Sequence, residues 1–173
     1  MEFSMSFKRF ALPSLIATAA FLSMGAAHAA GTATGTFNVN INVIGKCVIS
    51  TAATDIDFGT VEVGAATVTK NNTFSVQCSK KTGYTITLTP LNAGTGDNGG
   101  KMKTATGETI DYTMYSDAAG STPWGKTVGV SGTSSSSSSA AVDYKVYAKV
   151  TGGVVPDVPV GAYTDKVTIT VTY

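Results

Sequence analysis

The chain has 173 residues, and its 12 Lys and Arg against 11 Asp and Glu leave a formal net charge of only +1. A nearly neutral chain lacks the basic surface that nucleic-acid binding uses, so we expect no nucleic-acid partner. The single histidine, His28, and the single arginine, Arg9, lie near the N-terminus, and the rest of the chain has no imidazole for hydrolytic catalysis or for a His-containing metal site. We therefore expect a protein that is not an enzyme and that uses no cofactor and no metal ion.

Residues 1–29 have the layout of a secretory signal peptide. Lys8 and Arg9 precede a long apolar stretch, which ends in Ala27-His28-Ala29, the small-x-small pattern that signal peptidase recognises. A membrane anchor is the alternative, because the apolar stretch approaches the minimum length for spanning a bilayer. Its proline and its many small residues favour the signal peptide. Cleavage after Ala29 would leave residues 30–173 as an exported mature protein that is not embedded in a membrane.

Two cysteines, Cys47 and Cys78, remain in the exported part of the chain. An even number of cysteines in an oxidising compartment predicts one structural disulfide, and two thiols are too few for a structural zinc site. A redox-active pair is expected at a closer C-x-x-C spacing. The bridge would close a loop of about thirty residues, which the chain-entropy model values at roughly 3.5–4 kcal/mol.

The rest of the sequence predicts strands and no helices. Apolar and polar residues alternate without a fault in residues 37–43, as in a half-buried strand. The same alternation recurs in residues 74–76, 84–88, 110–115, 142–150 and 167–173. Glycine-rich turns separate these runs, at Asn92 to Gly100 and at residues 151–153, and the run Ser134 to Ser139 is expected to be a solvated loop. These patterns predict a single all-β domain, a sandwich rather than a parallel α/β sheet.

Several groups of residues then occur in a characteristic order. They are Asp55-Ile56-Asp57-Phe58-Gly59, Val76-Gln77-Cys78 with Gly83-Tyr84, the run Ile110 to Asp117 with Trp124-Gly125, and the ending Gly161 to Val171. Together with the two cysteines, they resemble the spore coat protein U domain family over nearly the whole mature chain. That family includes the subunits of archaic chaperone–usher pili, which are immunoglobulin-like sandwiches that lack their last strand. The resemblance implies an incomplete immunoglobulin-like β-sandwich of the pilin type, with an N-terminal donor strand.

The resemblance also implies a role for each end of the mature chain. Residues 30–44 would be a donor-strand extension and residues 45–173 the sandwich domain. From alternation alone, residues 37–43 would be the ordinary first strand of a complete sandwich. In the family reading, four side chains of the extension point into the groove of a neighbouring subunit: Phe37, Val39, Ile41 and Val43. Four residues of the last strand would border the groove and pair with a chaperone: Val167, Ile169, Val171 and Tyr173.

The partners implied by the resemblance are a periplasmic chaperone, an outer-membrane usher and further copies of the chain, joined head to tail by strand exchange. The product would be a fibre (fimbrium) at the cell surface, serving adhesion or biofilm formation. The alternative is a secreted monomeric coat protein or carbohydrate-binding module with a complete sandwich, in which Trp124 and the loops make the contacts. Asp55 and Asp57 lie two residues apart, which suggests a calcium ligand or a general acid, but two carboxylates do not complete a calcium shell.

Overall fold

The computed structural model describes residues 30–62, 64–134, 139–152 and 158–173. These ranges contain eight β-strands and no α-helix, and therefore no helix long and apolar enough to cross a membrane. The predicted signal peptide, residues 1–29, lies outside the described residues. The chain divides into two compact units, Met1–Ile41 and Asn42–Tyr173, and every strand belongs to the second unit.

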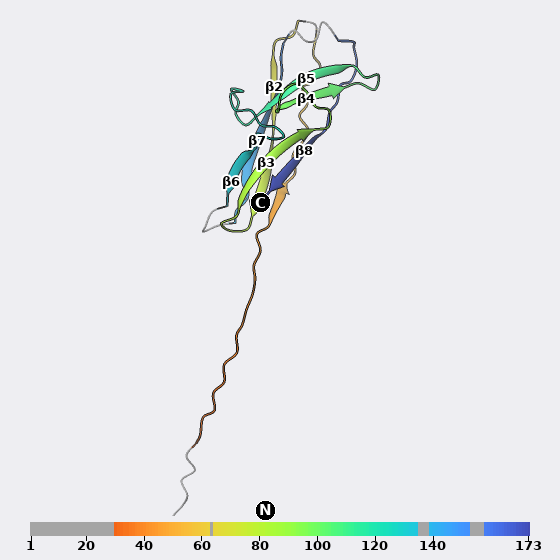
Figure 1. The fold of residues 1–173 in the computed structure, drawn as a ribbon. Helices are drawn as coiled ribbons and strands as arrows, with labels where there is room; N and C mark the ends of the chain where they lie inside the picture. The colour runs from red at the N-terminus through yellow and green to blue at the C-terminus, as the bar shows by residue number, and fades with distance from the viewer. Residues whose placement is uncertain (1–29, 63, 135–138, 153–157) are drawn as a thin grey trace, which may run out of the picture. The chain divides into compact units, whose positions relative to one another are not determined.

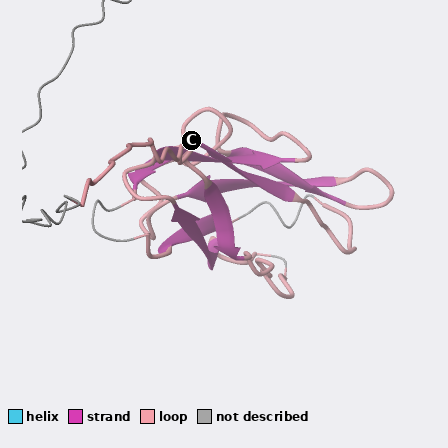
Figure 2. Cartoon of the chain, turned by 90° about the horizontal axis from the view of Figure 1, so that it is seen from below, coloured by secondary structure: helices cyan, strands magenta, loops and turns pink. Residues whose placement is uncertain are grey.

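The eight strands form two antiparallel sheets (Figures 1 and 2). In chain order they are β1 Cys47–Thr51, β2 Val68–Cys78, β3 Gly83–Pro90, β4 Gly99–Lys103, β5 Thr109–Tyr115, β6 Val130–Thr133, β7 Val142–Val150 and β8 Val167–Thr172. The order is β1-β2-β7-β5-β4 in the five-stranded sheet and β6-β3-β8 in the three-stranded sheet. The buried side chains of both sheets form one hydrophobic core. The predicted all-β fold, made of two packed sheets, is confirmed.

The alternating runs of the sequence correspond to strands with one exception. Residues 37–43 form no strand in this chain, and the side chains of Phe37 and Ile41 are 87% and 88% exposed. The sandwich begins instead at β1, whose first residue is Cys47. Alternation alone predicted that residues 37–43 are the first strand of the sandwich, and they are not.

The glycine-rich stretch from Asn92 to Gly100 was expected to be a turn. Only its first part is outside a strand, because its last two residues begin β4. Gly100 pairs with Tyr112 of β5, and the tyrosine ring lies on the glycine. A Cβ atom at position 100 would lie 2.2 Å from the ring carbon Cζ of Tyr112, which no side chain can do without displacing the ring. This glycine is therefore required by packing within the sheet rather than by a turn.

Aromatic side chains of the five-stranded sheet meet Trp124, from the loop between β5 and β6, in the core. The Phe74 ring lies 6.0 Å from that of Trp124 and 5.9 Å from that of Tyr144, measured between ring centroids. The indole nitrogen Nε1 of Trp124 donates a hydrogen bond of 2.7 Å to the carbonyl oxygen of Ile86, which satisfies its polar group inside the core. Trp124 is 0% exposed. It therefore cannot stack on a sugar, and its suggested role in a carbohydrate-binding module is wrong.

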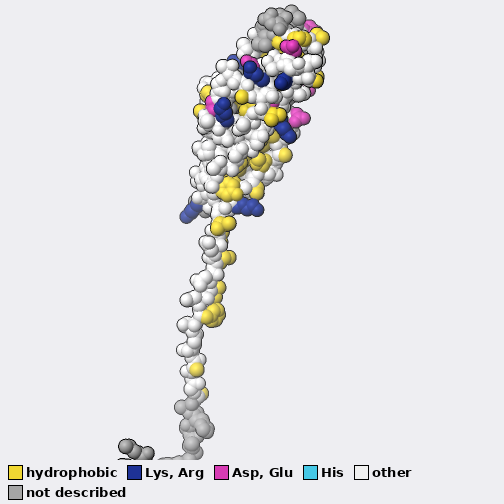
Figure 3. All heavy atoms as spheres, turned by 45° about the vertical axis from the view of Figure 1, so that its right-hand side comes forward, with side chains coloured by type: hydrophobic (Ala, Val, Ile, Leu, Met, Phe, Trp, Pro, Cys, Tyr) yellow, Lys and Arg dark blue, Asp and Glu magenta, His cyan; other side chains and the backbone are white. Residues whose placement is uncertain are grey.

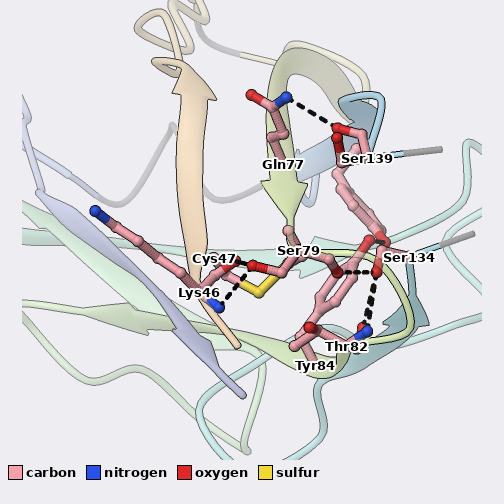
Figure 4. Close-up of a disulfide and its surroundings, with 10 residues drawn as sticks. Lys46, Cys47, Gln77, Ser79, Thr82, Tyr84, Ser134 and Ser139 are labelled. Carbon is pink, nitrogen blue, oxygen red and sulfur yellow. Dashed lines mark hydrogen bonds between the residues drawn. A yellow bond between two sulfur atoms is a disulfide. The ribbon is translucent and has the colours of Figure 1, made fainter. Parts of the chain in front are cut away.

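The predicted disulfide between Cys47 and Cys78 is present, at the end of the five-stranded sheet where β1 begins and β2 ends (Figure 4). The two cysteines are directly opposite each other in the β1–β2 ladder. Because β1 is an edge strand of only five residues, this crosslink fastens an edge of the sheet where the ladder is short.

Replacing Cys47 by serine is expected to lower the free energy of unfolding by about 2–5 kcal/mol, because loop closure no longer restricts the unfolded chain. The comparison is made by thermal unfolding of the oxidised protein and the variant, with Cys47→Ser/Cys78→Ser as a control without a free thiol. A thiol titration that finds both sulfurs reactive in the native protein would contradict the prediction.

The serine run begins with a buried anchor, which corrects the expectation of a fully solvated loop. Ser134 is buried, and its Oγ donates to the carbonyl oxygen of Ser79 and accepts a hydrogen bond of 3.0 Å from the backbone N–H of Thr82 (Figure 4). At the other end of the run, the carbonyl oxygen of Ser139 accepts a hydrogen bond from the Gln77 amide. The residues between, 135–138, lie outside the described ranges.

Candidate functional site

A hollow of about 710 Å³ lies between the two sheets of the sandwich. Its floor is apolar and comes from the interior faces of both sheets, through Leu88, Met114, Val146 and Ala148. One wall is the beginning of β8, and the other is the segment of residues 53–58 that follows β1. We call this hollow the groove.

The wall formed by β8 consists of side chains that the chain itself covers incompletely. Val167, Ile169 and Val171 alternate with exposed threonines and are only half-buried, whereas Ile86 and Leu88 of the neighbouring β3 are fully buried. Val167 and Ile169 line the groove, and Val171 packs further along the same face of the strand. Tyr173, also predicted to border the groove, follows the end of β8 and is largely exposed.

The outer edge of β8 has no strand beside it, because in the described ranges β8 pairs only with β3. The backbone N–H of Leu91 donates to the carbonyl oxygen of Lys166 at 2.7 Å, so the main chain of Lys166 faces β3. Since backbone groups alternate in direction along a strand, the N–H and C=O groups of Val167, Ile169 and Val171 face the open edge. An unpaired edge of this kind can accept another strand.

The opposite wall, residues 53–58, belongs to no strand. Ala53, Ile56 and Phe58 are partly buried against the core. The carbonyl oxygen of Thr54 accepts a hydrogen bond of 2.6 Å from the side-chain amide of Asn72, and Oδ1 of Asn72 is buried and has no hydrogen-bond partner in the part of the chain that the structure describes. This wall is therefore attached to the five-stranded sheet through side chains rather than through a backbone ladder.

The wall at residues 53–58 makes no backbone ladder with the sheet because β1 ends early. β1 pairs with β2 only over the stretch from Ser75 to Cys78, and its register is irregular between Ile49 and Thr51. Among the described residues, the first seven residues of β2, residues 68–74, consequently have no strand on the β1 side. The groove is thus bordered on both sides by main chain that lacks a complete set of strand partners.

One end of the groove is polar. The Asp165 carboxylate accepts hydrogen bonds of 2.8 Å from the Tyr112 hydroxyl and 2.8 Å from the Asn92 side-chain amide. Burial, together with the neighbouring Asp165, raises the pKa of Tyr112, so its hydroxyl remains a hydrogen-bond donor at all physiological pH values. This network fixes the start of β8 against β5, and so keeps one wall of the groove in place.

Asp55 and Asp57 are exposed on the rim of the groove. Asp57 accepts a hydrogen bond of 2.7 Å from the backbone N–H of Gly59, which makes a local turn. Among the described residues, no group of three or more His, Cys, Asp or Glu side chains is placed to hold a metal ion.

The N-terminal segment carries apolar side chains that are exposed. In the unit that ends at Ile41, the side chains of Phe37, Val39 and Ile41 are at least 85% exposed. Val43 and Ile44, which belong to the second unit, are also exposed. Figure 3 shows these hydrophobic side chains uncovered along the extended segment.

Sequence reasoning identified β8 but missed two features of the groove. The segment of residues 53–58 was noticed for its carboxylates and as part of the family resemblance but not as a wall of a groove, although Ile56 and Phe58 alternate with Asp55 and Asp57 as in a half-buried strand. The network around Asp165 joins residues far apart in sequence, so no local pattern could have revealed it.

Three comparisons with known proteins are informative. The sequence profile of the spore coat protein U domain matches residues 33–170. A search of curated proteins finds no match. One solved structure with a similar fold is a chain of the CsuC–CsuE chaperone–tip adhesion subunit pre-assembly complex from the archaic chaperone–usher Csu pili of Acinetobacter baumannii. The similarity has a TM-score of 0.51 and 24% sequence identity and covers 76% of this chain, which spans 40% of the length of the other chain.

Proposed function

The chain belongs to the spore coat protein U domain family, and we propose that it is the structural subunit of a surface fibre assembled by donor-strand complementation. In this proposal, the groove of each subunit receives the N-terminal segment of another. The observation that carries the proposal is the open groove, whose apolar floor and unpaired β8 edge lie in the same chain as an exposed, alternating apolar segment. The groove lacks a strand along β8, and the N-terminal segment has the alternating pattern of a strand but belongs to no sheet.

The dimensions of the two partners agree. Seven residues, 37–43, span about 23 Å as a strand, and the six residues of β8 span about 20 Å. Burial of the four inward side chains of the segment contributes roughly 1.5–3 kcal/mol each, before the loss of conformational freedom. The ladder with β8 adds hydrogen bonds of about 0.5–1.5 kcal/mol each.

The proposed organisation follows from this role. Residues 1–29 are a signal peptide, residues 30–44 the donor-strand extension and residues 45–173 the sandwich domain. Because a free groove exposes apolar surface and an unpaired edge, the subunit needs a temporary occupant before assembly, and we assign that role to a periplasmic chaperone that pairs with β8. An outer-membrane usher then passes the subunits to the cell surface, where the fibre serves adhesion or biofilm formation.

Strand exchange of this kind joins one surface of a subunit to a different surface of the next. Such a contact does not close on itself, so it generates a linear polymer. A secreted monomer with a complete sandwich is the competing function. The half-buried face of β8 and the complete burial of Trp124 both argue against it.

The size of the purified species distinguishes the two functions. On a non-reducing gel of unboiled material, a subunit whose groove is filled by its neighbour should give a ladder of multimers, and boiling should collapse the ladder to one band. A single monomer band before and after boiling would support the complete sandwich and overturn the proposal.

A further inference from the structure

The disulfide end of the sandwich is basic. Lys46, which precedes β1, is fastened to the turn after β2, because its carbonyl oxygen accepts a hydrogen bond from the Ser79 N–H at 2.8 Å and its own N–H donates to the Ser79 hydroxyl at 3.1 Å. Lys80 and Lys81 follow in that turn, and all three lysines are exposed. Figure 4 shows the Lys46 side chain extending away from the disulfide. In the part of the chain that the structure describes, none of the three forms an ion pair within 4.0 Å.

The opposite end of the sandwich carries the acidic rim of the groove. β1 runs from the disulfide end to Thr51, and the chain then continues into the wall that carries Asp55 and Asp57. Asp165, just before β8, lies on the same rim. Lys166 is the one cation among the groove-lining residues of the described ranges, so the rim retains an excess of negative charge.

Chain length fixes how close the two ends of neighbouring subunits must come. Only Ile44 and Gly45 separate Val43, the last inward residue of the extension, from Lys46. Three residue steps span at most about 10–11 Å. When Val43 sits in the groove of another subunit, Lys46 and the lysines of the adjoining turn therefore lie at the end of that groove.

The direction of the inserted strand decides which end this is. A strand parallel to β8 would bring Lys46 to the end of β8, beside the receiving subunit's own Lys46, Lys80 and Lys81. The like charges would repel each other there. The N-terminal extension of the receiving subunit also leaves its sandwich at this end and would occupy the same space. A strand antiparallel to β8 brings Lys46 to the start of β8, beside the carboxylates of the rim. Charge and space both favour the antiparallel direction.

We propose that the lysines at the disulfide end of one subunit, Lys46 and Lys80 with Lys81, dock on the acidic rim formed by Asp55 and Asp57 of the subunit whose groove the extension fills. This contact rests on the proposed strand exchange and adds a second surface to it. It orients the incoming subunit head to tail and raises the rate of encounter. Because the charges are exposed, salt should weaken the contact.

The test separates the charged contact from the groove. Two charge variants of the mature chain, residues 30–173, are compared with the unmodified chain: Lys46→Glu/Lys80→Glu at the basic end and Asp55→Lys/Asp57→Asn at the rim. Lys81 is kept because its backbone is left-handed, with φ of 59°. Asparagine at position 57 keeps the oxygen that accepts from Gly59. Lys126→Glu/Lys145→Glu, at two exposed lysines elsewhere, is the control for net charge.

Multimer formation is followed on unboiled gels after dilution from denaturant. At about 0.01 M salt, where screening acts over about 30 Å, each charge variant should assemble about threefold to tenfold more slowly than the unmodified chain. The difference should vanish at about 1 M salt. Combining the two sets of substitutions recreates opposite charges at the contact and should restore most of the rate, and the Lys126→Glu/Lys145→Glu control should be unaffected.

A peptide of residues 33–44 with blocked ends carries no charge and reports on the groove alone. It should raise the melting temperature of an acceptor whose own extension carries Ile41→Asp, and the rim substitutions should not change that shift. If the peptide binds but the charge variants assemble at the unmodified rate, or the combined variant is no faster than either alone, the docking contact is overturned and the strand exchange stands. If the peptide does not bind, the strand exchange fails and the docking contact fails with it.

Discussion

Replacing Ile41 by aspartate is expected to abolish fibre formation. In the proposed assembly this side chain enters the apolar groove of the next subunit, where Leu88, Met114 and Val146 offer no partner to a carboxylate. Burying an unpaired charge costs several kcal/mol, which is comparable with the burial gained by two or three neighbouring side chains. The ladder of multimers on an unboiled gel should be lost.

The matched control is Asn40→Asp, which introduces the same charge one residue earlier. Successive side chains of a strand point to opposite faces, so residue 40 faces away from the groove. This variant should form multimers nearly as well as the unmodified chain. Full-length fibres from Ile41→Asp would show that the segment does not fill the groove.

Moving residues 33–44 behind Tyr173 through a short Asn-Gly or Gly/Ser linker is expected to give a soluble monomer that needs no chaperone. β8 ends at the disulfide end of the sandwich, so a strand that turns back through a tight linker runs antiparallel to β8 along its open edge. The chain would then fill its own groove. The oligomeric state can be measured by size-exclusion chromatography.

The same rearranged chain should be much more resistant to heat than a subunit whose groove is empty. A net gain of about 4 kcal/mol, which is modest beside the burial of four apolar side chains, would raise the melting temperature by roughly 8–16 °C. The matched control carries Ile41→Asp in the moved segment and should lose most of this gain. A stable monomer obtained simply by deleting residues 30–44, without any added strand, would contradict the donor-strand function.

Most strands were predictable from the sequence because their burial is one-sided. The alternation in Tyr84 to Leu88 and in Val142 to Val150 predicted β3 and β7, since one face of each strand meets the core and the other meets solvent. β1, β4 and β6 were missed because they are only five, five and four residues long, and β4 and β6 also contain glycines. Their pairing depends on neighbours such as Tyr112, which approach through the fold rather than along the chain.

The groove was only partly predictable. The side chains of β8 could be assigned to one face, but alternation cannot tell whether a strand faces a completed core or an empty space. Likewise, residues 37–43 have the same pattern whether they form a strand in their own chain or in another. Periodicity does not distinguish these two roles, and the resemblance to a known family favours the second of them.

The sequence by itself determined the fold class, the disulfide pair and the strand faces, because alternation, cysteine count and turn residues act locally or through simple counting. The tertiary structure decided which edges have no partner. β1 ends at Thr51 while β2 continues, and β8 has a neighbouring strand on one side only within the described ranges. Both facts depend on how strands far apart in sequence pack together. The groove is a property of that packing, because its walls, residues 53–58 and β8, lie more than one hundred residues apart and meet only when both sheets have formed.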